Sequence, residues 1–346
     1  MGVEKFTVSR DDSVYECFPS LTQLKSGRLV LVYRESDGHG ATNYCRLIVR
    51  TSDDKGKTFS VERVLVDSKR ADGRIIHYNC PKVQQLRDGR VLISCDVYPN
   101  PPGENYQDGK ASHIMFWFSG DDGKSWAEPV DSGVRGIMPD EVIQLDSGDW
   151  LLATQFLNAE TKEIMQCVSR SADGGKTWQE PIIVASRGGY NFCEGSIVQM
   201  PGGELVCYMR ENSNMGRPIY KCISKDGGKT WEGPFVTQMD AGHRPVAHLT
   251  RSGKVLITYR HQIGGRSPMC KNVFSFMEST QSALNPERNL QSGILLPLDH
   301  DRNSNSDAGY TGCVETQPGE FLAVSYIKDD APMAQIRGYR FSERDF

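Results

Sequence analysis

The sequence predicts an all-β protein folded as a six-bladed β-propeller, and two kinds of internal repeat support this prediction. A short turn pattern, Ser-x-Asp-x-Gly-Lys-Ser/Thr-aromatic, occurs at residues 52–59, 119–126, 171–178 and 224–231. A longer pattern, in which two alternating apolar segments flank a glycine turn, occurs six times. Both recur at intervals of roughly 50 to 70 residues, which is typical of folds built from repeated units. Six copies of the longer pattern predict six blades.

The short pattern is typical of a tight hairpin turn. Its aspartate can accept hydrogen bonds from backbone N–H groups of the same turn, and its glycine can adopt a positive φ. The aromatic residue, two positions after the lysine, can fold back over the turn. This pattern is the Asp-box, so the chain resembles the sialidase-like β-propellers. We expect the four copies to have a structural rather than a chemical role.

The longer pattern predicts the inner hairpin of each blade. Its copies span residues 18–34, 80–96, 139–155, 194–210, 244–260 and 310–326. In each copy, apolar and polar residues alternate on both sides of the glycine, as they do in a half-buried β-hairpin. A second strand pair ending in an Asp-box is predicted to complete each of the first four blades.

The last two blades depart from this plan. Residues 271–285 form only a degenerate outer hairpin, and residues 333–341 form an outer strand without an Asp-box. We expect Lys5 to Val8 to add a strand to the last blade and so close the ring, which protects the exposed strand edges. Residues 1–346 are therefore predicted to form a single propeller domain.

Composition limits the partners. Hydrophobic residues make up 38% and charged residues 24% of the chain, an ordinary balance for a globular domain. The net charge of −4, without a basic run, argues against nucleic acid as a partner. No apolar stretch is long enough for a membrane span, and residues 1–10 lack the apolar region of a secretory signal, so we expect no membrane partner. The oligomeric state stays open.

The ten cysteines are scattered through predicted strands and include no Cys-x-x-Cys pair. They are interpreted as buried thiols in a reducing compartment, which favours a cytoplasmic location, or a secreted one if a signal precedes this sequence in the natural chain. No histidine or cysteine spacing is typical of a metal site, so we expect no catalytic metal and no cofactor.

Aligning the six hairpins on their glycines predicts where a site lies, because equivalent positions in repeated blades face one central funnel. Nine residues before the glycine stand Phe18, Cys80, Pro139, Glu194, Arg244 and Tyr310. Seven residues after it stand Arg34, Asp96, Gln155, Arg210, Arg260 and Tyr326. Both columns lie near the end of the hairpin remote from its turn and are expected to meet at one mouth. Several arginines there suit an anionic ligand such as a carboxylate or sulfate.

The resemblance to sialidases gives these residues roles. In that family a Tyr nucleophile is paired with a Glu that activates it, an Asp is the general acid/base, and three arginines bind the substrate carboxylate. The resemblance implies Glu194, Tyr310 and Asp37 as catalytic residues, and the spacing from Glu194 to Arg210 matches the family's. Together with the mouth columns, it predicts a substrate-binding set of Arg34, Arg210, Arg244, Arg260, Arg266, Asp96, Glu141 and His77. The chain departs from the family at Cys17, where the family carries the arginine of an Arg-Ile-Pro sequence.

The implied reaction is the removal of a terminal acidic sugar, a sialic, other ulosonic or uronic acid, from a glycan. Glu194 would take the proton of Tyr310, the phenolate would attack the anomeric carbon, and Asp37 would protonate the leaving oxygen. A phenol suits a substrate that already carries a carboxylate, because a carboxylate nucleophile would be repelled by it.

Three alternatives stay open. A conventional carboxylate pair of Glu194 with Asp140 or Glu141 resembles the exo-arabinanases, which are also six-bladed propellers. A uronate lyase would use a tyrosine or a histidine as its base, and the histidines near the predicted mouth are His39, His77, His243 and His261. The third alternative is a glycan-binding propeller without catalysis. The distance from Glu194 to Tyr310 separates the last alternative from the sialidase plan, because hydrogen-bond reach favours catalysis.

Overall fold

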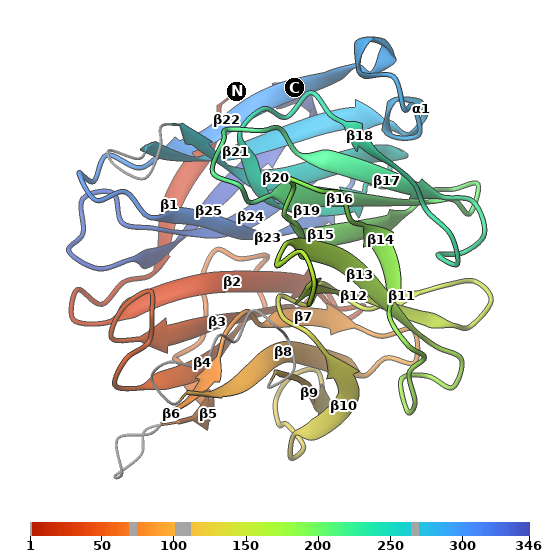
Figure 1. The fold of residues 1–346 in the computed structure, drawn as a ribbon. Coiled ribbons are helices and arrows are strands. Elements are labelled where there is room, and N and C mark those ends of the chain that lie inside the picture. The colour runs from red at the N-terminus through yellow and green to blue at the C-terminus, as the bar shows by residue number, and fades with distance from the viewer. Residues whose placement is uncertain (1, 69–74, 101–111, 264–269) are drawn as a thin grey trace.

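The computed structural model describes residues 2–68, 75–100, 112–263 and 270–346, and these residues form six antiparallel sheets. Figure 1 shows the sheets arranged around a common centre, with the first blades in red and orange and the last in blue. Helix is confined, in the described residues, to α1 (Thr280–Ala283) and two 3₁₀ turns, Arg288–Leu290 and Glu343–Asp345. The all-β propeller is thus confirmed. No helix among these residues is long and apolar enough to cross a membrane.

Each blade is a meander that runs from an inner strand near the centre to an outer strand at the rim. Blade 1 consists of β2 (Tyr15–Gln23), β3 (Leu29–Ser36), β4 (Cys45–Ser52) and β5 (Arg63–Asp67). Blade 2 consists of β6 (Ile75–Tyr78), β7 (Lys82–Gln85), β8 (Val91–Asn100), β9 (His113–Ser119) and β10 (Val130–Arg135). Blade 3 consists of β11 (Ile143–Gln144), β12 (Trp150–Leu157), β13 (Ile164–Ser171) and β14 (Ile182–Ala185). Blade 4 consists of β15 (Phe192–Gln199), β16 (Leu205–Glu211), β17 (Tyr220–Ser224) and β18 (Glu232–Val236). Blade 5 consists of β19 (Gly242–Leu249), β20 (Lys254–Ile263), β21 (Cys270–Ser279) and β22 (Gly293–His300). Blade 6 consists of β23 (Ala308–Gln317), β24 (Glu320–Ile327), β25 (Gln335–Ser342) and β1 (Glu4–Ser9).

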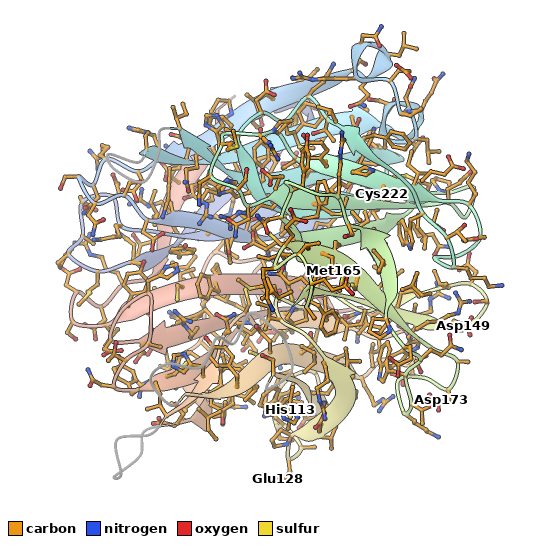
Figure 2. The ribbon with its side chains drawn as sticks, in the orientation of Figure 1. His113, Glu128, Asp149, Met165, Asp173 and Cys222 are labelled. Atoms are coloured by element: carbon orange, nitrogen blue, oxygen red, sulfur yellow. The ribbon has the colours of Figure 1, made fainter. Side chains whose placement is uncertain are left out.

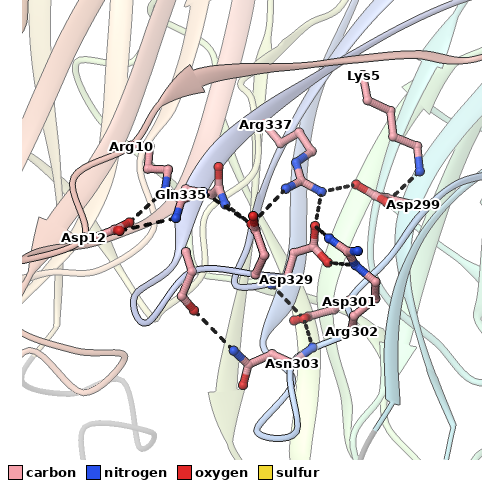
Figure 3. Close-up of polar contacts among 12 residues, drawn as sticks. Lys5, Arg10, Asp12, Asp299, Asp301, Arg302, Asn303, Asp329, Gln335 and Arg337 are labelled. Atoms are coloured by element: carbon pink, nitrogen blue, oxygen red, sulfur yellow. Dashed lines mark hydrogen bonds and ion pairs between the residues drawn. The ribbon is translucent and has the colours of Figure 1, made fainter.

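The ring closes as the sequence predicts, because β1 pairs with β25 and so completes blade 6. An ion-pair network beside this closure joins blade 6 to the outer strand of blade 5 (Figure 3). Lys5 Nζ lies 2.7 Å from Asp299 Oδ1, and Arg337 Nη1 lies 3.0 Å from Asp299 Oδ2 and 2.8 Å from Asp329 Oδ2. The closing strand β1 is therefore held by an ion pair to blade 5 as well as by its hydrogen-bonded ladder with β25.

The four Asp-box turns form the hydrogen bonds that their sequence predicts. In the first, Gly56 N donates to Ser52 Oγ at 2.9 Å, while Thr58 N and Oγ1 donate to Asp54 at 2.9 and 2.6 Å. Position 56 requires glycine for two reasons. Its φ is 79°, and a Cβ there would stand 2.4 Å from the Leu322 side chain of the neighbouring blade. The same bonds recur in the other three turns.

These turns lie at the rim, where Figure 2 shows Asp173 of the third box far from the centre of the ring. Blade 5 differs, because α1 follows β21 at the place where blades 1 to 4 carry the box. The hydrophobic core is divided between the blades: each of six apolar clusters in the described residues joins two neighbouring blades. All ten cysteines lie in the described residues and none forms a disulfide; nine are buried and Cys270 is partly exposed.

Candidate active site

A backbone irregularity marks the mouth end of four inner strands. Phe18, Glu194, Arg244 and Tyr310 have φ values of 56°, 52°, 48° and 56°, in the left-handed region that non-glycine residues rarely adopt. The strand register shifts at the same four places, which is a β-bulge in blades 1, 4, 5 and 6. Each such residue costs about 1–3 kcal/mol of backbone strain, and bulges re-aim side chains beside active sites. In these four blades the bulge therefore changes the direction in which the residue of the first mouth column points.

Blade 2 shows no such register shift, and its inner strand is instead interrupted at residues 79–81, between β6 and β7. Asp96 of the second column bridges this break, since it accepts from Cys80 N at 2.9 Å and from Met138 N of blade 3 at 3.1 Å. Asn79 Nδ2 also donates to Asp96 at 2.9 Å. The predicted ligand residue Asp96 thus holds together the backbone of two blades.

Glu194 and Tyr310, two blades apart, meet at the mouth. The Tyr310 hydroxyl donates a hydrogen bond to Glu194 Oε1, and Arg210 Nη1 donates to the same oxygen at 2.8 Å. Arg210 is steadied from its other side by Asn212 Oδ1, 2.5 Å from its Nη2. All three site residues are buried, with exposed fractions of 3% for Glu194, 7% for Tyr310 and 9% for Arg210. A base, its phenol and a cation therefore form one contiguous group.

The charges around this group favour an ionised Glu194. Burial alone would raise its pKa, but the guanidinium groups of Arg210, Arg260 and Arg244 outweigh burial, so the pKa of Glu194 lies below its ordinary value. Burial raises the pKa of Tyr310 well above 10, and the Glu194 charge adds to that rise. The resting pair is a carboxylate that accepts from a neutral phenol, which is the starting state for proton transfer to Glu194.

Two further arginines flank Tyr310. The guanidinium carbons of Arg260 and Arg244 lie 5.2 and 5.7 Å from the centre of its ring. Arg244 Nη2 donates to Pro139 O at 2.9 Å, and Arg260 Nη2 lies 3.1 Å from His243 Nδ1. Arg244 Nη1 and Arg260 Nε are buried and have no hydrogen-bond partner among the described residues. Buried donors of this kind are expected to meet a ligand, because an unpaired charged donor is costly.

Blade 1 contributes an aromatic wall where the family carries an arginine. The Phe18 ring lies 4.9 Å from Tyr310 and 5.4 Å from Tyr326, and the Arg34 guanidinium lies 4.5 Å from the Phe18 ring. Cys17 is fully buried opposite Arg34 in the ladder of β2 and β3. Blade 1 therefore offers the mouth an aromatic ring with the Arg34 guanidinium against it, and Cys17 itself brings no cation.

Asp37 holds its own loop together. Its carboxylate accepts from Thr42 N at 2.7 Å, from Asn43 N at 3.0 Å and from Asn43 Nδ2 at 2.5 Å. The structure gives Asp37 no contact with Glu194 or Tyr310. The loop presents His39, two residues further on, whose ring lies edge-on to Phe18 at 5.4 Å.

The other predicted ligand residues are dispersed. Glu141 lines a cavity of about 250 Å³ with His248, Thr250 and Arg251, near the hairpin turns rather than the mouth. Its neighbour Asp140 lies 3.6 Å from Lys82 Nζ, so the structure does not pair these carboxylates with Glu194.

His77 is buried and stacks on Tyr98 at 4.8 Å, and neither of its ring nitrogens has a hydrogen-bond partner among the described residues. Burial, with a smaller contribution from Arg34, lowers the pKa of His77 to about 4. Arg266 lies outside the described residues.

Asp307 is the mouth residue that the sequence did not reveal. It accepts from Lys271 Nζ at 2.6 Å, from the Tyr326 hydroxyl at 3.1 Å and from the Tyr15 hydroxyl, and its Oδ2 lies 2.8 Å from His39 Nδ1. Although burial opposes ionisation, His39 and Lys271 hold the pKa of Asp307 far below its ordinary value. The only sequence signal was its place three residues before Tyr310. In the part of the chain that the structure describes, no three His, Cys, Asp or Glu side chains group so as to hold a metal ion.

The repeated blades agree with the family comparison. The family model for the BNR repeat-like domain matches residues 79–283, more than half of the chain. The chain belongs to the BNR repeat-like family. A sialidase from Bacteroides fragilis is 29% identical over 124 residues, a segment that spans 33% of this chain and 21% of that protein. The match thus covers about a fifth of the relative's length.

Solved structures share the fold over nearly the whole chain. A Dyadobacter fermentans protein of unknown function has a TM-score of 0.75 at 21% identity, with 99% of each chain covered. A Hadza microbial sialidase has a TM-score of 0.67 at 17% identity and covers 98% of this chain and 68% of its own. The GH93 α-L-arabinofuranosidase of Fusarium graminearum has a TM-score of 0.66 at 13% identity, with 99% of each chain covered. At these identities the comparison shows a shared fold. This fold occurs in both the Hadza sialidase and the Fusarium graminearum α-L-arabinofuranosidase.

Proposed function

We propose that this BNR-family propeller is a sialidase-like exo-glycosidase that removes a terminal acidic sugar from a glycan through a Tyr310-bound intermediate. The observation that carries the proposal is the hydrogen bond from the Tyr310 hydroxyl to Glu194 Oε1. The two residues come from blades 4 and 6, and each stands in a strained left-handed conformation. A scaffold that only bound a glycan would gain nothing from holding a phenol on a buried carboxylate at that cost.

The geometry supports a two-step displacement. In the first step the Tyr310 oxygen bonds to the anomeric carbon, the phenol proton passes to Glu194, and the bond to the leaving oxygen breaks as that oxygen takes a proton from a general acid. In the second step water replaces Tyr310 at the anomeric carbon and gives one proton back to that group, while Glu194 returns its proton to the phenolate. Arg210 supports both steps, because its charge keeps Glu194 ionised between turnovers.

The arginines favour an acidic sugar. Arg244 and Arg260 both lie beside the Tyr310 ring, and each has a buried donor without a partner among the described residues, so they would bind a substrate carboxylate close to Tyr310. A neutral phenol can approach such a substrate without the repulsion that a carboxylate nucleophile would meet. Since Cys17 and Phe18 replace a cation on the blade 1 side, we expect an acidic sugar other than N-acetylneuraminic acid to be the preferred substrate.

The test is a panel of aryl glycosides of sialic acid, other ulosonic acids, uronic acids and arabinofuranose. Turnover of one acidic sugar, with release of the free sugar, is the expected result. Turnover of the arabinofuranoside alone would favour a carboxylate pair, and release of an unsaturated uronic acid would identify a lyase. Binding of the acidic glycans without turnover would make the protein a glycan-binding propeller and overturn the proposal.

A further inference from the structure

A histidine–carboxylate pair stands at the rim of the mouth, next to the aromatic wall of Tyr310. His39 Nδ1 lies 2.8 Å from Asp307 Oδ2. The His39 side chain is 57% exposed whereas that of Asp307 is only 13% exposed. Phe18 joins this pair to the nucleophile, since its ring contacts His39 at 5.4 Å and Tyr310 at 4.9 Å. An exposed imidazole on a buried carboxylate is the arrangement that proton-transfer histidines use.

The contacts fix which nitrogen is available. Asp307 is ionised and can only accept, so the Nδ1 of His39 carries a hydrogen toward it. The Nε2 of His39 makes no hydrogen bond within the described part of the chain, and the side chain that carries it is more than half exposed. Arg34 Nη2 donates to the backbone carbonyl of His39, and the Asp37 carboxylate accepts from Thr42 N in the same loop. The backbone that carries His39 is therefore held in place. Nε2 is therefore free to give or take a proton at the mouth.

We propose that His39, positioned by Asp307, is the general acid and base of the reaction described under the proposed function, on which this inference rests. In the first step, as the bond to the leaving oxygen breaks, His39 Nε2 gives its proton to that oxygen. In the second step Nε2 takes the proton of the water that attacks the anomeric carbon. One proton leaves and one returns per turnover, and no other reactant is required.

The groups around this pair gather on its carboxylate. The titratable or charged groups that face it are Tyr15, Arg34, Asp37, Lys271 and Tyr326. Lys271 and the two tyrosine hydroxyls all donate to Asp307 and do not contact the imidazole nitrogens. Both carboxylate oxygens of Asp37 accept hydrogen bonds from backbone N–H groups of its own loop. This carboxylate is therefore already occupied and does not compete with His39 as the general acid and base.

The test compares leaving groups of different acidity on whichever acidic glycoside the panel identifies. An alkyl glycoside needs a proton on its leaving oxygen, whereas an activated aryl glycoside does not. His39→Gln is expected to lose about 100-fold or more of kcat/KM on the alkyl glycoside and less than about tenfold on the aryl one. The high-pH limb of kcat/KM on the alkyl glycoside is expected to disappear in the same variant.

A matched control exists in blade 2. His113 Nδ1, at the start of β9, lies 2.7 Å from Asp131 Oδ2 in an exposed histidine–aspartate pair (Figure 2). His113→Gln is expected to leave both rates unchanged. Asp307→Asn tests positioning, and is expected to reproduce the dependence on leaving group without changing KM. Thermal unfolding of each variant shows whether the fold is kept.

Other outcomes overturn the inference. Equal losses on the two substrates in His39→Gln, or no loss at all, would make His39 a structural residue. A dependence on leaving group seen in Asp37→Asn and not in His39→Gln would assign the acid to Asp37. Tyr310→Phe separates the two proposals: if it keeps its activity on both substrates, the nucleophile is wrong, whatever His39 does.

Discussion

In the Asp-box turns of blades 1 to 4 the same serine, aspartate and glycine make the same hydrogen bonds, whereas at the mouth one backbone position carries a different side chain in every blade. The outer turns bind only their own backbone and their neighbouring blade, as Gly56 does against Leu322. The mouth brings together Glu194, Tyr310 and Arg210 from separate strands. In a propeller, therefore, positions that repeat their chemistry stabilise the ring, and positions that repeat only their geometry are free to build a site.

The two regions also use ionisation differently. The box aspartates are exposed, and hydrogen bonds from the turn lower their pKa, as the Ser125 hydroxyl and backbone do for Asp121. At the mouth, burial opposes ionisation and neighbouring cations overcome it for Glu194. Substitutions in the outer turns should therefore change stability, and substitutions at the mouth should change chemistry.

The largest effect is expected from Tyr310→Phe. It removes the nucleophile and leaves the ring packed on Phe18, so kcat on the identified glycoside should fall at least about a thousandfold. The midpoint of thermal unfolding should change little, because within the described residues the hydroxyl makes one hydrogen bond, to Glu194. Loss of folding together with loss of activity would mean that the mouth, like the outer turns, is structural.

A smaller effect, with a pH signature, is expected from Arg210→Met. It removes the largest of the cationic influences that lower the pKa of Glu194, while burial, which raises that pKa, stays. The wild-type acidic limb of kcat/KM should lie below pH 4.5, because Glu194 must be ionised to act as the base. In Arg210→Met the limb should move to higher pH, with a loss of about tenfold to a hundredfold above it. An unmoved limb would contradict the role of Glu194.

Asp121→Asn tests the outer turns against the mouth. The carboxylate accepts from Ser125 N and Oγ, so its loss should lower the unfolding temperature by a few degrees and leave kcat unchanged. Since the pKa of Asp121 is lowered by folding, its stabilisation is present at neutral pH and is lost as pH falls. The neighbouring Asp122→Asn is the control and should change neither. A fall in kcat in Asp121→Asn with the fold intact would break the distinction between the two regions.

The smallest effect is expected at the cavity near the hairpin turns that Glu141 lines. Burial, with a smaller contribution from Asp140, raises the pKa of Glu141 to about 7. The folded state therefore holds this proton more tightly than the unfolded chain, and stability should decline as pH rises from about 4.5 to about 7. Glu141→Gln should unfold at a higher temperature than wild type at pH 8 and at a similar one at pH 4. Its activity reports on the carboxylate-pair alternative, which requires a large loss.

Much of the fold was predictable from the sequence, because hairpin alternation and turn glycines are local signals. The six hairpins, four boxes and the closing strand near Lys5 required no knowledge of distant contacts. The short helix α1 was not predicted, since residues 271–285 show only the weakening of the outer hairpin pattern. The break between β6 and β7 and the shortness of β11 were not predicted, because the hairpin alignment treated these two inner strands like the other four.

The site was predictable only where the repeat delivers it. The alignment placed Glu194, Arg210 and Tyr310 in columns that do converge at the mouth. It could not reveal their left-handed backbone, because nothing local favours such a φ at Glu194 or Tyr310. Asp307 escaped because it stands outside the aligned columns and gains its meaning only from residues far along the chain.

The most direct test of the central claim is to find the covalent intermediate. A fluorinated analogue of the identified sugar, which slows the second step, is turned over briefly, and the quenched protein is digested and analysed by peptide mass spectrometry. The account predicts the mass of the sugar on the peptide that contains Tyr310, and its absence in Tyr310→Phe. The same mass on a peptide carrying Glu194 or Glu141 would contradict it.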